Sequence, residues 1–160
     1  MRRILFLAVL FVSGFAFSFL FAEQKYFNDF QLRSDFQKGL EKLLDGNQTV
    51  SLSDLKNQLT QKRSKVELGE IPLHSVSPDN LYDQVSKSVL VIGRLYNCGK
   101  CSKWHTSIAS AFAIGKNGLI VTNYHVLEKD DGEILGARDF KGHIFSIEKV
   151  IAANEQDDLA

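Results

Sequence analysis

Apolar positions follow a helical spacing in the first part of the chain and a strand-like pattern from residue 81 onward. Apolar side chains recur at roughly helical intervals over residues 27–44, and a narrow leucine stripe follows over residues 52–61. Both patterns predict short helices. Because these helices carry too little apolar surface for a core of their own, we expect residues 23–63 to form a helical spacer.

The region after the spacer changes to short strands with turn signals every ten or so residues. Residues 64–80 contain both prolines and little periodicity, which predicts a linker. In residues 81–160, an Asn117-Gly118 pair between two apolar runs is a strong hairpin signal. Strands are predicted at 88–96, 108–114, 119–122, 134–137 and 143–152. This pattern indicates a mainly β fold, an antiparallel barrel or sandwich.

The N-terminus has the composition of a targeting segment. Arg2 and Arg3 precede an apolar stretch over residues 4–22, which predicts a signal peptide at 1–22. The alternative is an N-terminal membrane anchor, since the stretch is just long enough to span a bilayer. Both interpretations place the rest of the chain outside the cytoplasm, as a periplasmic or extracellular protein.

Composition excludes few function classes. Hydrophobic residues make up 44% and charged residues 24% of the chain, as in ordinary globular proteins. The formal net charge is zero, so no electrostatic argument favours a nucleic-acid partner and none is predicted. The pattern says nothing about oligomeric state.

The most informative stretch covers residues 110–127, SAFAIGKNGLIVTNYHVL. It resembles the histidine motif of trypsin-like serine peptidases, most closely the HtrA (Do-like) branch, whose pattern is S-G-F-x-I-x-x-x-G-x-I-V-T-N-x-H-V. Ala111 stands where that family usually has glycine. The positions that match in register are Ser110, Phe112, Ile114, Gly118, Ile120, Val121, Thr122, Asn123, His125 and Val126.

The resemblance covers roughly residues 81–160. Leu81–Val89 is similar to the segment that opens the family's domain, a short turn or helix followed by the first barrel strand. Near the other end, Asp158 precedes Leu-Ala, as the family's second catalytic residue does. The implied fold is the first antiparallel β-barrel of the two-barrel trypsin-like fold, in incomplete form.

The resemblance implies a role for two side chains. A serine hydroxyl needs a base whose pKa lies near the working pH, and a buried carboxylate on the other ring nitrogen fixes the tautomer of that base. His125 would be the general base and acid, and Asp158 the orienting carboxylate, with Asp157 as the alternative. No Gly-x-Ser-Gly-Gly motif occurs in the sequence.

These observations favour a serine endopeptidase that acts on exported proteins or peptides. Because the family's nucleophile serine comes from its second barrel, we expect the present chain to be an inactive fragment of such an enzyme. The alternative hypothesis is a non-catalytic pseudoprotease or a secreted binding domain. No cofactor is predicted, and the residues that would set cleavage specificity lie in the family's second barrel.

Two cysteines, Cys98 and Cys101, lie in a predicted loop. In an exported protein this even count favours a local disulfide, which is our prediction. Together with His105 they also give a C-x2-C-x3-H spacing, which offers metal ligands but no apparent fourth one. Metal binding and free thiols are therefore the alternatives, and no metal site is predicted.

Overall fold

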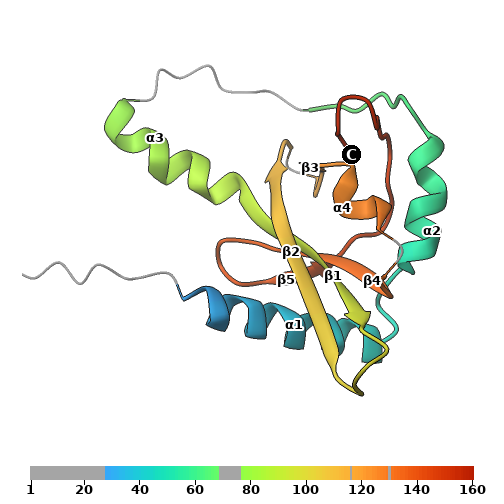
Figure 1. The fold of residues 1–160 in the computed structure, drawn as a ribbon. Helices are drawn as coiled ribbons and strands as arrows, with labels where there is room; N and C mark the ends of the chain where they lie inside the picture. The colour runs from blue at the N-terminus through green and yellow to red at the C-terminus, as the bar shows by residue number, and fades with distance from the viewer. Residues whose placement is uncertain (1–27, 69–76, 116, 130) are drawn as a thin grey trace, which may run out of the picture.

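The computed structural model describes residues 28–68, 77–115, 117–129 and 131–160. Its centre is a five-stranded antiparallel sheet with the strand order β3-β2-β1-β4-β5, curved as a half-barrel (Figure 1). The prediction of a mainly β, antiparallel fold is confirmed. The strands are β1 Val89–Asn97, β2 Trp104–Ala113, β3 Ile120–Thr122, β4 Ile134–Arg138 and β5 Ile144–Ser146.

The last predicted strand, over residues 143–152, is longer than the observed β5. The N–H of Ile147, the residue after β5, still donates to the Leu135 carbonyl of β4 at 3.1 Å. Beyond it, the backbone takes partners from the N-terminal helical region. The N–H groups of Val150 and Ala153 donate to the Oε1 atom of Gln58 (2.7 Å) and to the carbonyl of Gln61 (2.8 Å). These hydrogen bonds satisfy the backbone without a neighbouring strand, which is why the ladder ends early.

The end of the chain returns to β3. Thr122 and Ala160 exchange two backbone hydrogen bonds of 2.8 and 2.9 Å, the pattern of an antiparallel pair. Just before, Asn154 and Leu159 form an antiparallel bridge across a tight turn. Residues that follow β5 therefore reach the opposite edge of the sheet and lie beside β3.

The N-terminal helices belong to the same core as the sheet, so the prediction that this helical region is a spacer is wrong for the described residues 28–60. Helix α1 (Asp29–Asp45) and helix α2 (Leu52–Asn57), continued by η1 (Gln58–Thr60), form where helices are predicted. Their apolar side chains bury themselves on the sheet, because neither helix has a core of its own. The fully buried helix residues are Phe36, Leu40, Leu52 and Leu55.

Two opposed glycines let α1 approach the sheet closely. Gly93 of β1 pairs with Gly136 of β4. A Cβ atom added at Gly93 would collide with the Ser107 carbonyl and the Phe36 ring, and one at Gly136 would collide with Leu40. The missing side chains therefore make the space that the two apolar residues of α1 fill.

Two short helices border the sheet. Helix α3 (Pro78–Val85) with η2 (Ser86–Ser88) leads into β1, and helix α4 (His125–Glu128) follows β3 (Figure 1). The predicted linker overlaps the start of α3, and residues 69–76 lie outside the described part. The predicted signal peptide or anchor at 1–22 also lies outside it. Among the described residues, no helix has the length and apolar character to cross a membrane.

We predict that Phe36→Ala lowers the free energy of unfolding by about 3–5 kcal/mol, because it empties a fully buried site between α1 and the sheet. Phe30 lies on the same helix but is 81% exposed, so Phe30→Ala should change stability by less than about 0.5 kcal/mol. Urea unfolding of both variants measures the difference. Equal effects would contradict the packing of α1.

We also expect Gly136→Ala to cost about 1–3 kcal/mol, because the new methyl group overpacks the contact with Leu40. The control is Gly115→Ala, where the nearest atom to the added Cβ lies at 3.9 Å and the change should be close to neutral. Thermal and urea unfolding of the two variants decides the point. A stable Gly136→Ala protein would show that the helix docks elsewhere.

Candidate functional site

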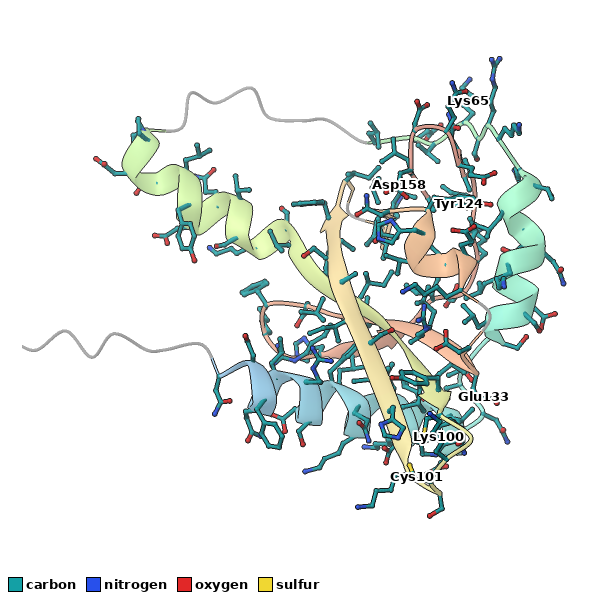
Figure 2. All side chains as sticks on the ribbon, viewed as in Figure 1. Lys65, Lys100, Cys101, Tyr124, Glu133 and Asp158 are labelled. Carbon is teal, nitrogen blue, oxygen red and sulfur yellow. The ribbon has the colours of Figure 1, made fainter. Side chains whose placement is uncertain are left out.

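His125 and Asp158 come together from segments 33 residues apart in the sequence. β3 ends at Thr122, and α4 begins at His125. Asp158 lies in the tight turn that precedes the pairing of Ala160 with β3. Figure 2 shows Asp158 beside Tyr124, at the end of the sheet where α4 begins. The return of the chain to β3 therefore places the carboxylate beside the imidazole.

Asp158 holds the imidazole by its Nδ1 atom. The Nδ1 atom lies 2.9 Å from Oδ2 and 3.0 Å from Oδ1 of Asp158. The backbone N–H of His125 donates to Oδ1 at 3.0 Å, and the side-chain amide of Asn123 donates to Oδ2 at 3.0 Å. One carboxylate thus binds both the ring and the backbone of the same histidine, which fixes the position of the ring.

Hydrogen bonding also stabilises the charged form of Asp158. The backbone N–H of His125 contributes most to a pKa below the ordinary value of 3.8, and the side chains of His125 and Asn123 lower it further. Desolvation acts in the opposite direction and is outweighed. Asp158 is therefore a carboxylate at neutral pH. A carboxylate at Nδ1 favours the tautomer with hydrogen on that nitrogen.

The other ring nitrogen of His125 faces away from this network. Within the described residues, Nε2 has no hydrogen-bond partner, and the side chain is 59% exposed. With Nδ1–H bound to the carboxylate, Nε2 keeps its lone pair and accepts a proton from a group outside the pair. The arrangement has the chemical capacity of a general base.

The alternative carboxylate, Asp157, is oriented differently. Its Oδ2 atom accepts a hydrogen bond from the side-chain amide of Asn154. The structure therefore brings Asp158 and not its neighbour to His125. Asn123 matches the motif, but the sequence analysis gave it no role. Its position two residues before His125 is the signal that could have indicated its contact with Asp158.

A second histidine–aspartate pair offers a comparison within the same chain. His143 Nδ1 lies 2.9 Å from Asp139 Oδ2, a distance equal to that of the first pair. Asp139 also accepts the backbone N–H groups of Lys141 and His143, at 2.9 and 2.8 Å. All these residues lie in the turn between β4 and β5. This pair is explained by local turn geometry, because its bonds link residues at most four apart.

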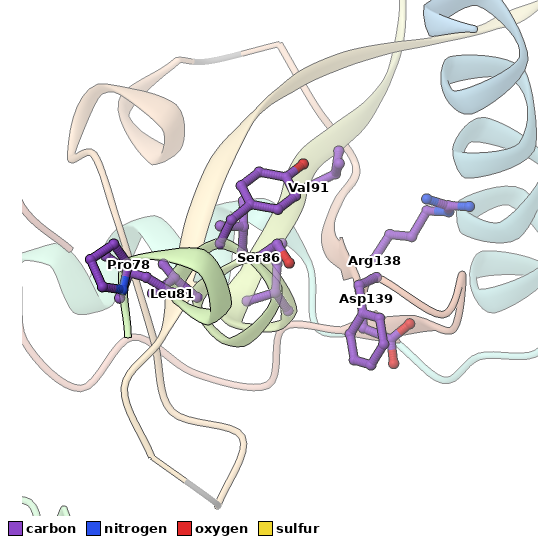
Figure 3. Close-up of a pocket in the computed structure, with 11 residues that line it drawn as sticks. Pro78, Leu81, Ser86, Val91, Arg138 and Asp139 are labelled. Carbon is purple, nitrogen blue, oxygen red and sulfur yellow. The ribbon is translucent and has the colours of Figure 1, made fainter. Parts of the chain in front are cut away.

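The structure also contains an apolar pocket of about 730 Å³ (Figure 3). Neither His125 nor Asp158 lines it. Its one carboxylate, Asp139, is already bound to His143. The pocket lies between α3, the start of β1 and the turn after β4, and its lining residues are Pro78, Leu81, Tyr82, Val85, Ser86, Val89, Leu90, Val91, Arg138, Asp139 and Phe140.

The two cysteines are free thiols in the structure. Their Sγ atoms lie 3.3 Å apart, whereas a disulfide bond measures about 2.05 Å. The backbone N–H of Lys100 contributes most to a lowered pKa of the Cys98 thiol, about 7, with a further hydrogen bond from Cys101. The predicted disulfide stays a prediction.

Comparison with known proteins adds no family assignment. No family model matches the chain, and no curated protein is significantly similar to it. The motif around His125 and the geometry of its pair with Asp158 are the features that indicate a function.

We predict that the Asp158 carboxyl titrates below 3.8 and that His125→Ala raises its pKa only in part. The imidazole is lost in this variant, but the backbone N–H, which contributes most, remains. Asn123→Ala should also raise it. Carbon-detected NMR of the side-chain carboxyl measures all three proteins.

The same hydrogen bonds make stability depend on pH. Because the folded pKa of Asp158 is lowered, its bonds favour the folded state above the unfolded pKa, and this gain is lost as pH falls through the folded value. Asp158→Asn should flatten that part of the stability profile. A carboxyl that titrates at the ordinary value in the wild-type protein would contradict the network.

Proposed function

We propose that residues 81–160 are the base-bearing part of a trypsin-like serine endopeptidase of the HtrA type. The observation that carries this proposal is the 2.9 Å contact between His125 Nδ1 and the Asp158 carboxylate. In a histidine-dependent peptidase, this contact is the one that orients the base. The sequence motif around His125 supports the same assignment.

The proposed mechanism uses the two ring nitrogens for different tasks. Asp158 binds Nδ1–H and leaves the lone pair of Nε2 available. Nε2 takes the proton of the attacking serine hydroxyl, and the imidazolium that forms is stabilised by the carboxylate. His125 then returns the proton to the leaving amine. Asn123 and the backbone of His125 keep the carboxylate in place during both transfers.

The sheet supports the proposed fold. A five-stranded antiparallel half-barrel, with the residues after Asp158 returning to β3, is the arrangement expected of the first barrel of a trypsin-like protein. In that arrangement the serine and the oxyanion-binding groups belong to a second barrel. The proposal therefore requires a nucleophile serine supplied by such a second barrel, on the exposed side of the His125 ring.

The departure from the family motif at Ala111 is compatible with this fold. Ala111 of β2 is fully buried and pairs with Leu90 on one side and Thr122 on the other. Its methyl group fills part of the core rather than colliding with a neighbouring strand. Alanine fits at this position, so the fold needs a small side chain there and does not need backbone angles that only glycine adopts.

The proposed substrates are exported proteins or peptides. The basic and apolar pattern of residues 1–22 supports export, with membrane anchorage through residues 4–22 as the alternative. No nucleic-acid partner or cofactor is part of the proposal.

The test uses the full-length gene product, in which the proposal requires a Gly-x-Ser-Gly-Gly segment. His125→Ala should abolish cleavage of an unfolded protein substrate, and Asp158→Asn should lower kcat by about ten-thousand-fold, since the base loses its oriented tautomer. His143→Ala is the matched control, because it breaks the other histidine–aspartate pair and should leave turnover intact.

Labelling with a fluorophosphonate probe gives an independent readout of the activated serine. The probe should label the wild-type protein and the His143→Ala variant but not the His125→Ala variant. Undiminished cleavage by His125→Ala would sink the proposal. A gene product without the serine motif would favour the non-catalytic binding domain instead.

A further inference from the structure

Three metal-binding side chains gather at the hairpin between β1 and β2. β1 ends at Asn97 and β2 begins at Trp104, so Cys98 and Cys101 lie in the loop that joins them. His105 lies one residue inside β2, where it pairs with Tyr96. The register of the hairpin therefore brings the imidazole back beside the loop.

The loop holds its shape through local contacts. Gly99 has a φ of 69°, a left-handed conformation that glycine adopts without strain. Its N–H donates to the side chain of Asn97 at 2.9 Å. The ring of His105 lies against that of Tyr96, with 5.6 Å between the ring centroids. These contacts orient the imidazole and the first cysteine before any ligand binds.

The three ligand atoms lie close to the spacing that one tetrahedral ion requires. The Sγ atoms of Cys98 and Cys101 are 3.3 Å apart, Cys101 Sγ is 3.1 Å from His105 Nε2, and all three lie within 4.8 Å of one another. Tetrahedral zinc with ordinary bond lengths separates two sulfurs by about 3.8 Å and a sulfur from a nitrogen by about 3.6 Å. Small rotations of these side chains, which move each ligand atom by about half an ångström, open the space that the ion needs.

We infer that Cys98, Cys101 and His105 form a Zn²⁺ site at the tip of this hairpin, with a fourth position open to solvent. Two thiolates with one imidazole form a ligand set that zinc accepts, alongside an exchangeable fourth ligand. Among the described residues, no further histidine, cysteine or carboxylate joins the group. A disulfide would account for the two sulfurs but not for the imidazole at 3.1 Å.

The charges around the loop fit a zinc–thiolate centre. Two thiolates and one Zn²⁺ sum to zero, so the ion removes the repulsion between neighbouring thiolates. The loop that carries the cysteines contains Lys100 and Lys103 and no acidic residue, so no carboxylate of the loop adds negative charge to the centre. The site is exposed at both cysteines, so the ion reaches it without opening the fold.

The site lies at the opposite end of the sheet from the His125–Asp158 pair. Figure 2 places Cys101 at the tip of the hairpin and Asp158 at the far end of the molecule. β2 alone spans ten residues, or roughly 33 Å. Zinc there would fasten the end of β1 to the start of β2 and would take no part in peptidase chemistry. This inference is independent of the proposed function.

The experiment titrates the reduced, oxygen-free 160-residue chain with Co²⁺, which occupies zinc sites and absorbs light. We expect one bound cobalt with thiolate-to-cobalt charge-transfer bands, and stoichiometric displacement by Zn²⁺. Zn²⁺ should also raise the midpoint of thermal unfolding and change the fluorescence of Trp104, the only tryptophan.

Variants separate metal binding from disulfide formation. Cys98→Ser and His105→Ala should each weaken cobalt binding by more than about 100-fold. Residues that only hydrogen-bond to a metal ligand typically cost less than this when they are replaced. His105→Ala keeps both thiols and can still form a disulfide. His143→Ala, a histidine elsewhere on the surface, is the control and should bind as the wild type does.

Alkylation of the cysteines supplies a second measurement that does not depend on colour. Zn²⁺ should protect the thiols of the wild type from iodoacetamide and leave those of His105→Ala reactive, while circular dichroism confirms that both proteins are folded. A wild-type chain without charge-transfer bands in excess cobalt would overturn the inference. So would equal binding and protection in His105→Ala.

Discussion

The two hydrogen bonds between Thr122 and Ala160 are the constraint on which the candidate site depends. They join the end of β3 to the end of the described chain. This pairing brings the turn that contains Asp158 next to His125. The Asn154–Leu159 bridge narrows the turn that carries the carboxylate. Because the backbone supplies this geometry, the two side chains meet at 2.9 Å.

Comparison of the two histidine–aspartate pairs shows why a short distance is not enough to identify a catalytic pair. Both pairs have a 2.9 Å contact. In one, the partners lie four residues apart in a turn, and the bond helps to close that turn. In the other, they lie 33 residues apart, so turn geometry does not account for the bond. Both carboxylates also accept the backbone N–H of their histidine, and sequence separation is what distinguishes the pairs. The long-range pair needs the whole half-barrel to hold it.

The sequence was informative wherever local patterns determine structure. The hairpin at Asn117-Gly118, the helix of the leucine stripe and the strand that precedes His125 all follow from short-range preferences. The docking of α1 could not be predicted, because it depends on Gly93 and Gly136 being opposite each other in strands far apart in the sequence. The approach of His105 to Cys101 likewise required the hairpin register.

Asp158 has a φ of 52°, in the left-handed region. This conformation costs most residues about 1–2 kcal/mol, whereas Asn, Asp and Gly adopt it readily. Asn and Gly are each one base change away from an aspartate codon. Under the proposed function, a lineage that abandons proteolysis can therefore lose the carboxylate in one mutational step and keep the turn. In descendants of such a lineage, asparagine or glycine at this position would be the genetic trace of lost catalysis in a fold that still forms.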